Sequence, residues 1–239
     1  LPAAPEGWTI RPVEESDVKA LLARRQKDDD PAVASLIREL LSEGDAKGAT
    51  TALQVYARKD RLVAFKLVRQ PDSLFTDPAN LPQLDALLGQ DSLRALQDFG
   101  RVRGLDISEL VLPEKTRARI FTAGIGAQLR LWVVASDKLQ DKDLVPFLET
   151  LDVKAMNAAV LDPESGVGDV PVIVLFSDLD PAARSAYEAD RAARAADRDA
   201  RLAQRRAALA AAPAVEGGQA AETGCRDLGN GVTICATGG

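Results

Sequence analysis

The segment between Asp180 and Pro213 most constrains the fold of this chain. Asp180 is a typical helix N-cap, Pro181 is favoured in a first turn, and Pro213 stops a helix. Roughly 32 residues at about 1.5 Å each give a helix of about 48 Å. Its large apolar side chains are Tyr187, Leu202 and Leu209. Such a helix cannot bury an ordinary core face, so the chain is expected to be one domain with a long arm.

Alanines in this segment recur with alternating gaps of four and three residues. This alanine seam occupies every a and d position of a heptad repeat and consists of Ala182, Ala186, Ala189, Ala193, Ala196, Ala200, Ala203, Ala207 and Ala210. Alanine lets two helices approach to about 8 Å but buries little area. Two interpretations stay open. The seam packs on a partner helix, or the helix is a solvated spacer stabilised by alanine propensity and pairs such as Arg184 with Glu188.

The residues before the arm mix hairpin and helix patterns. Alternating apolar residues in 50–58 and 61–69, around Lys59-Asp60, predict the clearest hairpin. Further strands are expected at 8–13, 106–112, 116–122, 128–135 and 170–176, and helices at 18–25, 31–41, 81–99 and 143–161. This order predicts an α+β fold in which helices pack on one face of an antiparallel sheet built from hairpins.

Two cysteines near the C-terminus indicate a disulfide. A three-residue loop, Gly229-Asn230-Gly231, would place Cys225 directly opposite Cys235 in a small β-hairpin. Closing about eleven residues would stabilise it by roughly 3 kcal/mol. Because stable disulfides need an oxidising compartment, we expect a periplasmic or secreted protein. The chain starts at Leu1 and its one methionine is Met156, which is compatible with a cleaved export signal or a shortened chain.

These patterns divide the chain into five parts. We expect an N-terminal arm at 1–13, an α+β domain at 14–177, the long helix at 178–213, a linker at 214–223 and a disulfide hairpin tail at 224–239.

Composition excludes several kinds of chemistry. The chain has no histidine, so histidine-based triads and HExxH zinc sites cannot form. Its net charge of -6 argues against nucleic-acid binding. No apolar run reaches the roughly 18 residues of a membrane span, so no transmembrane segment is expected.

Several charged clusters are better explained as local structure than as binding sites. We interpret Asp28-Asp29-Asp30 as a helix cap, and Asp137, Asp141 and Asp143 as a solvated loop and a cap. Asp162, Glu164 and Asp169 are weak Ca²⁺ candidates. Arg101 and Arg103 are expected in a polar loop after a helix. We therefore expect no metal site, cofactor or catalytic residue.

The sequence favours an exported, non-enzymatic interaction or structural protein. It would be a subunit of a larger assembly, which could be associated with a membrane. A protein partner or a second copy would dock through residues 180–239, using the alanine seam and the tail. The alternative is a periplasmic small-ligand-binding or carboxylate-dependent enzymatic domain whose helix is a spacer.

Overall fold

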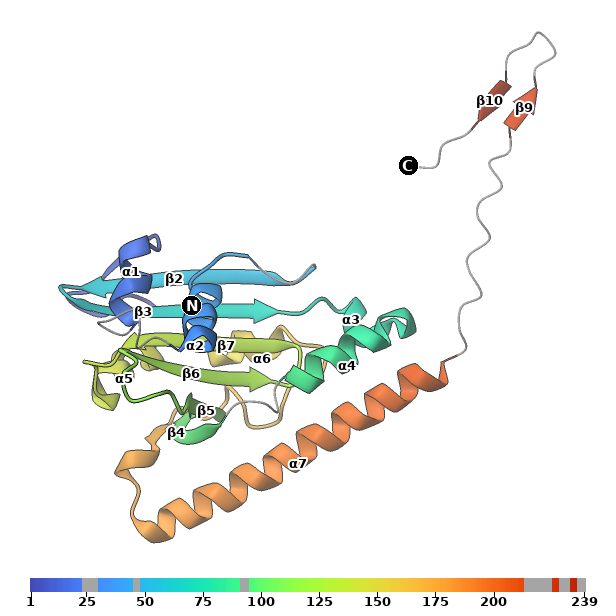
Figure 1. Ribbon diagram of the computed structural model, residues 1–239. Helices are drawn as coiled ribbons and strands as arrows, with labels where there is room; N and C mark the ends of the chain where they lie inside the picture. Colours follow the sequence, from blue (N-terminus) through green and yellow to red (C-terminus); the bar gives the residue numbers. More distant parts are fainter. Residues whose placement is uncertain (23–29, 45–47, 91–94, 213–224, 228–232, 236–239) are drawn as a thin grey trace.

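An eight-stranded antiparallel sheet forms the centre of the protein (Figure 1). The computed structural model describes residues 1–22, 30–44, 48–90, 95–212, 225–227 and 233–235. The strand order is β1-β2-β3-β7-β6-β5-β4-β8. The strands are β1 (Thr9–Arg11), β2 (Thr50–Arg58), β3 (Arg61–Arg69), β4 (Leu96–Val102), β5 (Leu105–Leu110), β6 (Ala118–Ile125), β7 (Leu129–Ser136) and β8 (Ile173–Leu175). The predicted α+β class is confirmed.

The first predicted hairpin is confirmed residue by residue. β2 and β3 pair from Thr50 opposite Arg69 to Arg58 opposite Arg61, and Lys59 turns the chain with a φ of 56°. β1 pairs with β2 at the sheet edge. The β6–β7 hairpin pairs from Ala118 opposite Ser136 to Ile125 opposite Leu129.

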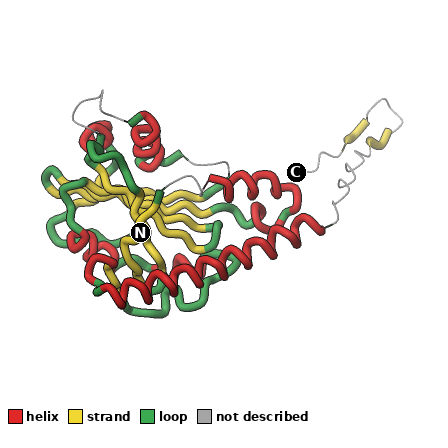
Figure 2. The backbone as a smooth tube through the Cα atoms, turned by 60° about the horizontal axis from the view of Figure 1, so that its bottom comes forward, coloured by secondary structure: helices red, strands yellow, loops and turns green. Residues whose placement is uncertain are grey.

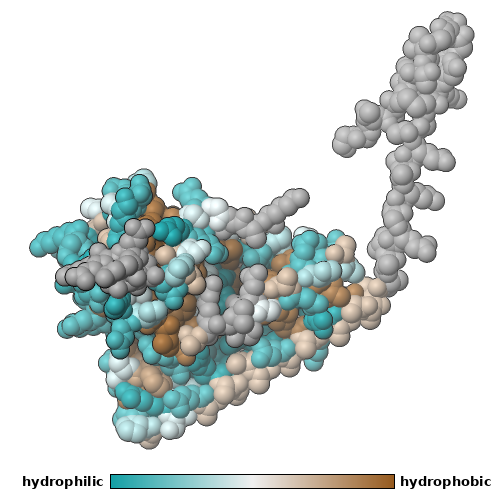
Figure 3. All heavy atoms as spheres, viewed as in Figure 1, coloured by the Kyte–Doolittle hydropathy of each residue, from teal (hydrophilic) through white to brown (hydrophobic). Residues whose placement is uncertain are grey.

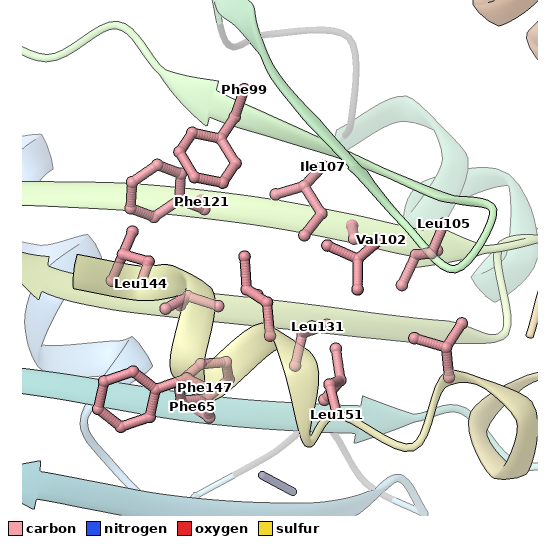
Figure 4. Packing of buried hydrophobic residues seen from close by; sticks show 14 of the residues in the cluster. Phe65, Phe99, Val102, Leu105, Ile107, Phe121, Leu131, Leu144, Phe147 and Leu151 are labelled. Atoms are coloured by element: carbon pink, nitrogen blue, oxygen red, sulfur yellow. The ribbon is translucent and has the colours of Figure 1, made fainter. Parts of the chain in front are cut away.

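Helices cover both faces of the sheet rather than the single face expected. Helices α1 (Glu15–Leu21) and α2 (Pro31–Leu40) share one core with Leu62 and Ala64. Helices α5 (Asp141–Glu149) and α6 (Val153–Ala158) share the other with Phe65. Figure 4 shows Phe147 of α5 against Phe65 of β3, with ring centroids 5.8 Å apart. Successive β3 residues are apolar, so each face of the sheet needs its own cover.

The helix expected at 81–99 is wrong in its second half. Helix α4 covers Leu81–Gln90, and β4 then pairs with β5 through the turn Arg103-Gly104, where both φ angles are positive. A Cβ on Gly104 would lie 2.0 Å from the Gly166 carbonyl oxygen, so this turn requires glycine.

Two other predicted elements are shorter or divided. The helix expected at 143–161 splits into α5 and α6, because the Asp152 side chain caps a new helix by accepting from Ala155 N at 2.9 Å. The last strand is limited to β8. In the described part of the domain there are also three short helices: α3 (Ser73–Thr76), η2 (Pro78–Asn80) and η4 (Phe176–Asp178).

The long helix and the small hairpin both occur where predicted. Helix α7 (Pro181–Ala211) is capped by the Asp180 side chain, which accepts from Ala183 N at 2.9 Å. Strands β9 (Cys225–Asp227) and β10 (Thr233–Cys235) pair with Cys225 opposite Cys235. Their loop at 228–232 lies outside the described residues, as does the linker from 213 to 224, and the disulfide itself stays a prediction.

Candidate functional site

Helix α7 lies along the domain with one face and leaves the opposite face in solvent (Figure 2). All nine residues of the alanine seam are exposed. The side opposite the seam carries an arginine every seven residues, at Arg184, Arg191, Arg198 and Arg205. We call these, with Arg194 and Arg201, the arginine face. The face that contacts the domain is therefore cationic, and the seam is not used within the chain.

The N-terminal half of α7 is held by one aromatic anchor and by ion pairs. Tyr187 is buried against Phe176, with ring centroids 5.5 Å apart, and the Arg101 guanidinium lies 4.9 Å from its ring centroid. Burial raises the pKa of Tyr187 to about 12. Arg191 pairs with Asp98 of β4 and donates to Ser108 Oγ of β5 at 2.7 Å. This half of the helix thus contacts the β4–β5 hairpin.

A buried carboxylate, Asp106 of β5, connects these contacts. Its side chain is 7% exposed and accepts from Arg101 Nε at 2.6 Å, while Arg194 lies 3.5 Å away. Arg194 also donates to the Gly104 carbonyl oxygen. Arg101 pairs in addition with Asp190 of α7 at 2.7 Å. Asp106 therefore sits between one arginine of the sheet and one of the helix.

The C-terminal half of α7 is held in the same way, with an apolar anchor at its end. Arg205 pairs with Asp162 and donates to the Phe75 carbonyl oxygen at 3.3 Å. Arg206 pairs with Asp85 of α4 at 2.9 Å. Leu209 is buried in a small apolar cluster with Leu74, Phe75 and Leu84. Acidic residues from separate elements of the domain thus match the arginines of one helix.

A cavity of about 380 Å³ lies between this half of α7 and the end of the β6–β7 hairpin. Its lining combines apolar side chains with arginines and carboxylates. The residues are Phe75, Leu88, Ile125, Gly126, Ala127, Gln128, Arg130, Val160, Leu161, Asp162, Glu164, Arg198, Asp199, Arg201, Leu202 and Arg205.

The structure gives the other charged clusters local roles. Asp30 caps α2 through the backbone of Ala32 and Val33, whereas residues 28 and 29 lie outside the described part. Asp143 caps α5 by accepting from Gln140 N at 2.9 Å. Arg101 lies in strand β4 and Arg103 in the turn between β4 and β5, so the expected loop after a helix is wrong for Arg101, and the turn at Arg103 follows a strand.

The structure also shows the surroundings of the acidic residues near positions 137 and 162. Asp141 pairs with Arg119 at 2.7 Å, Asp169 lies 3.5 Å from Lys154, and Asp137 is exposed. Glu164 is buried and accepts from Gly126 N at 2.8 Å. In the described part of the chain, no group of three or more metal-ligating side chains is placed to hold an ion.

The arginine face was not predicted, although the sequence contains its signal. Arginine at 184, 191, 198 and 205 follows the same seven-residue period as the seam, half a turn away. A cationic face with a helical period indicates a helix that packs on acidic residues.

No family model, no curated protein and no solved structure matches the chain. Among the described helices, none is both long enough and apolar enough to cross a membrane.

Proposed function

We propose that this chain is an exported, non-enzymatic interaction protein whose docking surface is the alanine seam of α7. One observation carries the proposal. The nine seam residues share the solvent-exposed face of a 31-residue helix whose other face is occupied by its own domain. Figure 3 shows a pale brown band over α7 along its lower edge, the colour of alanine in this view. A row of small side chains along the exposed side of a helix allows close approach of a second helix.

The charge pattern defines the partner that would fit. The arginines of α7 contact the domain, whereas Glu188 and Asp197 are exposed beside the seam. Asp190 and Asp199 are exposed as well, although Asp190 also pairs with Arg101 and Asp199 also lines the cavity. The outer face of the helix therefore carries mostly carboxylates around a core of alanine. The best-matched occupant is a helix of another protein with small residues on its contact face and lysine or arginine at its flanks.

The proposed compartment is inferred from the two cysteines. The opposed positions of Cys225 and Cys235 support a disulfide, and a disulfide favours a periplasmic or secreted protein in a larger assembly. The hairpin tail would add a second contact with the partner.

Leucine substitution within the seam tests the proposal. Ala193→Leu and Ala200→Leu place bulk in the contact row, whereas Ala208→Leu adds the same bulk at an exposed position outside it. Chemical crosslinking in cells, followed by affinity purification and mass spectrometry, should find a crosslinked partner that the two seam variants lose and Ala208→Leu keeps. The crosslinks should map to α7 and to a basic, small-residue helix of the partner.

Two results would overturn this assignment. Equal recovery of the partner with all three variants would show that the seam is not the contact. A wild-type dimer in light scattering that the seam variants alone abolish would assign the seam to a second copy instead.

A further inference from the structure

We infer that the cavity between α7 and the β6–β7 hairpin binds a small organic anion, namely a carboxylate carried on an apolar chain. This site is separate from the alanine seam, and neither proposal depends on the other. The cavity, at about 380 Å³, lies within the size range of small-molecule sites, which is roughly 300–1,000 Å³.

Part of the cavity lining is apolar. Phe75 comes from α3, Ile125 from the end of β6, Val160 and Leu161 from the segment after α6, and Leu202 from α7. An aliphatic chain placed against these side chains would leave water, and this favours a ligand with an apolar body over inorganic phosphate or sulfate.

The lining also carries cationic donors. The lining has four arginines against three carboxylates, and two of these carboxylates, Asp162 and Glu164, already face Arg205 and Arg198. Arg201 Nη2 pairs with Asp197 at 3.0 Å. Its Nε is buried and has no hydrogen-bond acceptor. A buried N–H without an acceptor is unfavourable, and a ligand carboxylate would supply one.

The wall facing α7 is held in place before any ligand binds. The Gln128 side chain donates to Asp72 at 2.6 Å and accepts from Leu161 N at 2.7 Å. Asn157 donates to the Glu164 carbonyl oxygen and accepts from Glu164 N, both at 2.8 Å. These bonds fix the segment from 161 to 164, so binding would require little ordering of the protein.

The position of the cavity gives ligand binding a second effect. Arg198, Arg201 and Leu202 belong to α7, whereas Ile125 and Leu161 belong to the domain. A ligand that contacts both sides binds only when the helix is docked, so it should stabilise the docked state by mass action.

The test uses octanoate as the probe and ¹⁵N-labelled full-length protein. Octanoate should shift the amide signals of Gly126, Ala127 and Leu161 with a Kd on the order of 1 mM. Octanol and octylammonium have the same chain without the carboxylate, and acetate has the carboxylate without the chain. All three should bind at least roughly tenfold more weakly.

Two variants of the same helix locate the carboxylate. Arg201→Met keeps the stem and removes the donors, and it should weaken octanoate roughly tenfold. Arg206→Met is the matched control, because Arg206 pairs with Asp85 and does not line the cavity. Its affinity should equal that of the wild type.

The ligand series in the wild type keeps the inference falsifiable if Arg201→Met disturbs the helix. Octanol that binds as tightly as octanoate would show an apolar cavity only, and acetate that binds as tightly would show a simple anion site. Absence of shifts at these amides up to about 20 mM octanoate, well above the expected Kd, would exclude the site. Each of these results overturns the inference and leaves the seam proposal unaffected.

Discussion

Replacing Asp106 by Asn should loosen α7 from the domain far more than replacing Asp85 by Asn. Both carboxylates pair with arginines of α7, and both substitutions keep the side-chain shape. They differ in burial. The side chain of Asp106 is 7% exposed, whereas that of Asp85 is 39% exposed and its partner Arg206 is 53% exposed.

The expected magnitudes follow from this difference. Removing one partner of a buried ion pair costs about 3–5 kcal/mol, because a charge stays buried without compensation. Arg101 and Arg194 keep 21% and 25% of their surface in water, so we reduce the cost to about 2–3 kcal/mol. Undocking of α7 would expose the side chains at positions 101, 106 and 194 to water. The substitution therefore destabilises the docked state relative to the undocked one. The exposed Asp85 pair should contribute only about 0–1 kcal/mol.

Tryptic cleavage within α7 measures the docking equilibrium. When opening and closing are fast, the cleavage rate follows the population of the open form. A change of about 2–3 kcal/mol corresponds to a roughly 30- to 150-fold faster cleavage after Arg191 and Arg194 in Asp106→Asn. Asp85→Asn should raise the rate of this cleavage less than about sixfold. A double-mutant cycle with Arg194→Met should show coupling with Asp106. Equal cleavage rates for the two Asn variants would refute the idea that buried ion pairs hold the helix.

Three further predictions concern the domain and the tail. Phe147→Ala removes a fully buried ring from the α5 core and should lower the free energy of unfolding in urea by about 3–5 kcal/mol, with an unchanged m-value. Burial raises the pKa of Asp17, but hydrogen bonds from Arg11 and from a backbone amide outweigh this and hold it below its usual value. Its stabilisation is therefore present above about pH 4 and lost as the pH falls further, so Asp17→Asn should flatten the loss of stability between about pH 4 and pH 2. Reduction should increase the intact mass by about 2 Da if Cys225 and Cys235 are bridged, and two free thiols before reduction would remove the argument for export.

The elements that could be predicted are those whose signals are local. The β2–β3 hairpin has alternating apolar residues and a two-residue turn, and α7 has a capping residue followed by proline. The helix predicted through Phe99 is wrong in its second half. The leucine spacing up to this residue fits a helix, so the prediction extends too far. The segment becomes strand β4 because it pairs with β5 through the turn at Arg103-Gly104, a contact that spacing alone does not reveal.

The site required a different kind of information. The nine alanines of the seam could be found from their spacing in the sequence. Their exposure could not be predicted, because it depends on which face of α7 meets the domain. That choice is decided by Asp98, Asp106, Asp162 and Glu164, which lie on strands and loops far apart in the sequence. The cavity depends on the same placement, since α7 forms one of its walls.

The two faces of α7 are physically linked. An alanine seam buries little area, so its affinity for another helix depends strongly on the entropy lost when the helix is positioned. The arginine face, Tyr187 and Leu209 fix α7 on the domain, and this would remove part of that entropy loss if a partner binds as proposed. It follows that Asp106→Asn should weaken partner binding although Asp106 lies beneath the helix, on the side away from the seam. An anion bound in the cavity should act in the opposite direction, because it would favour the docked helix.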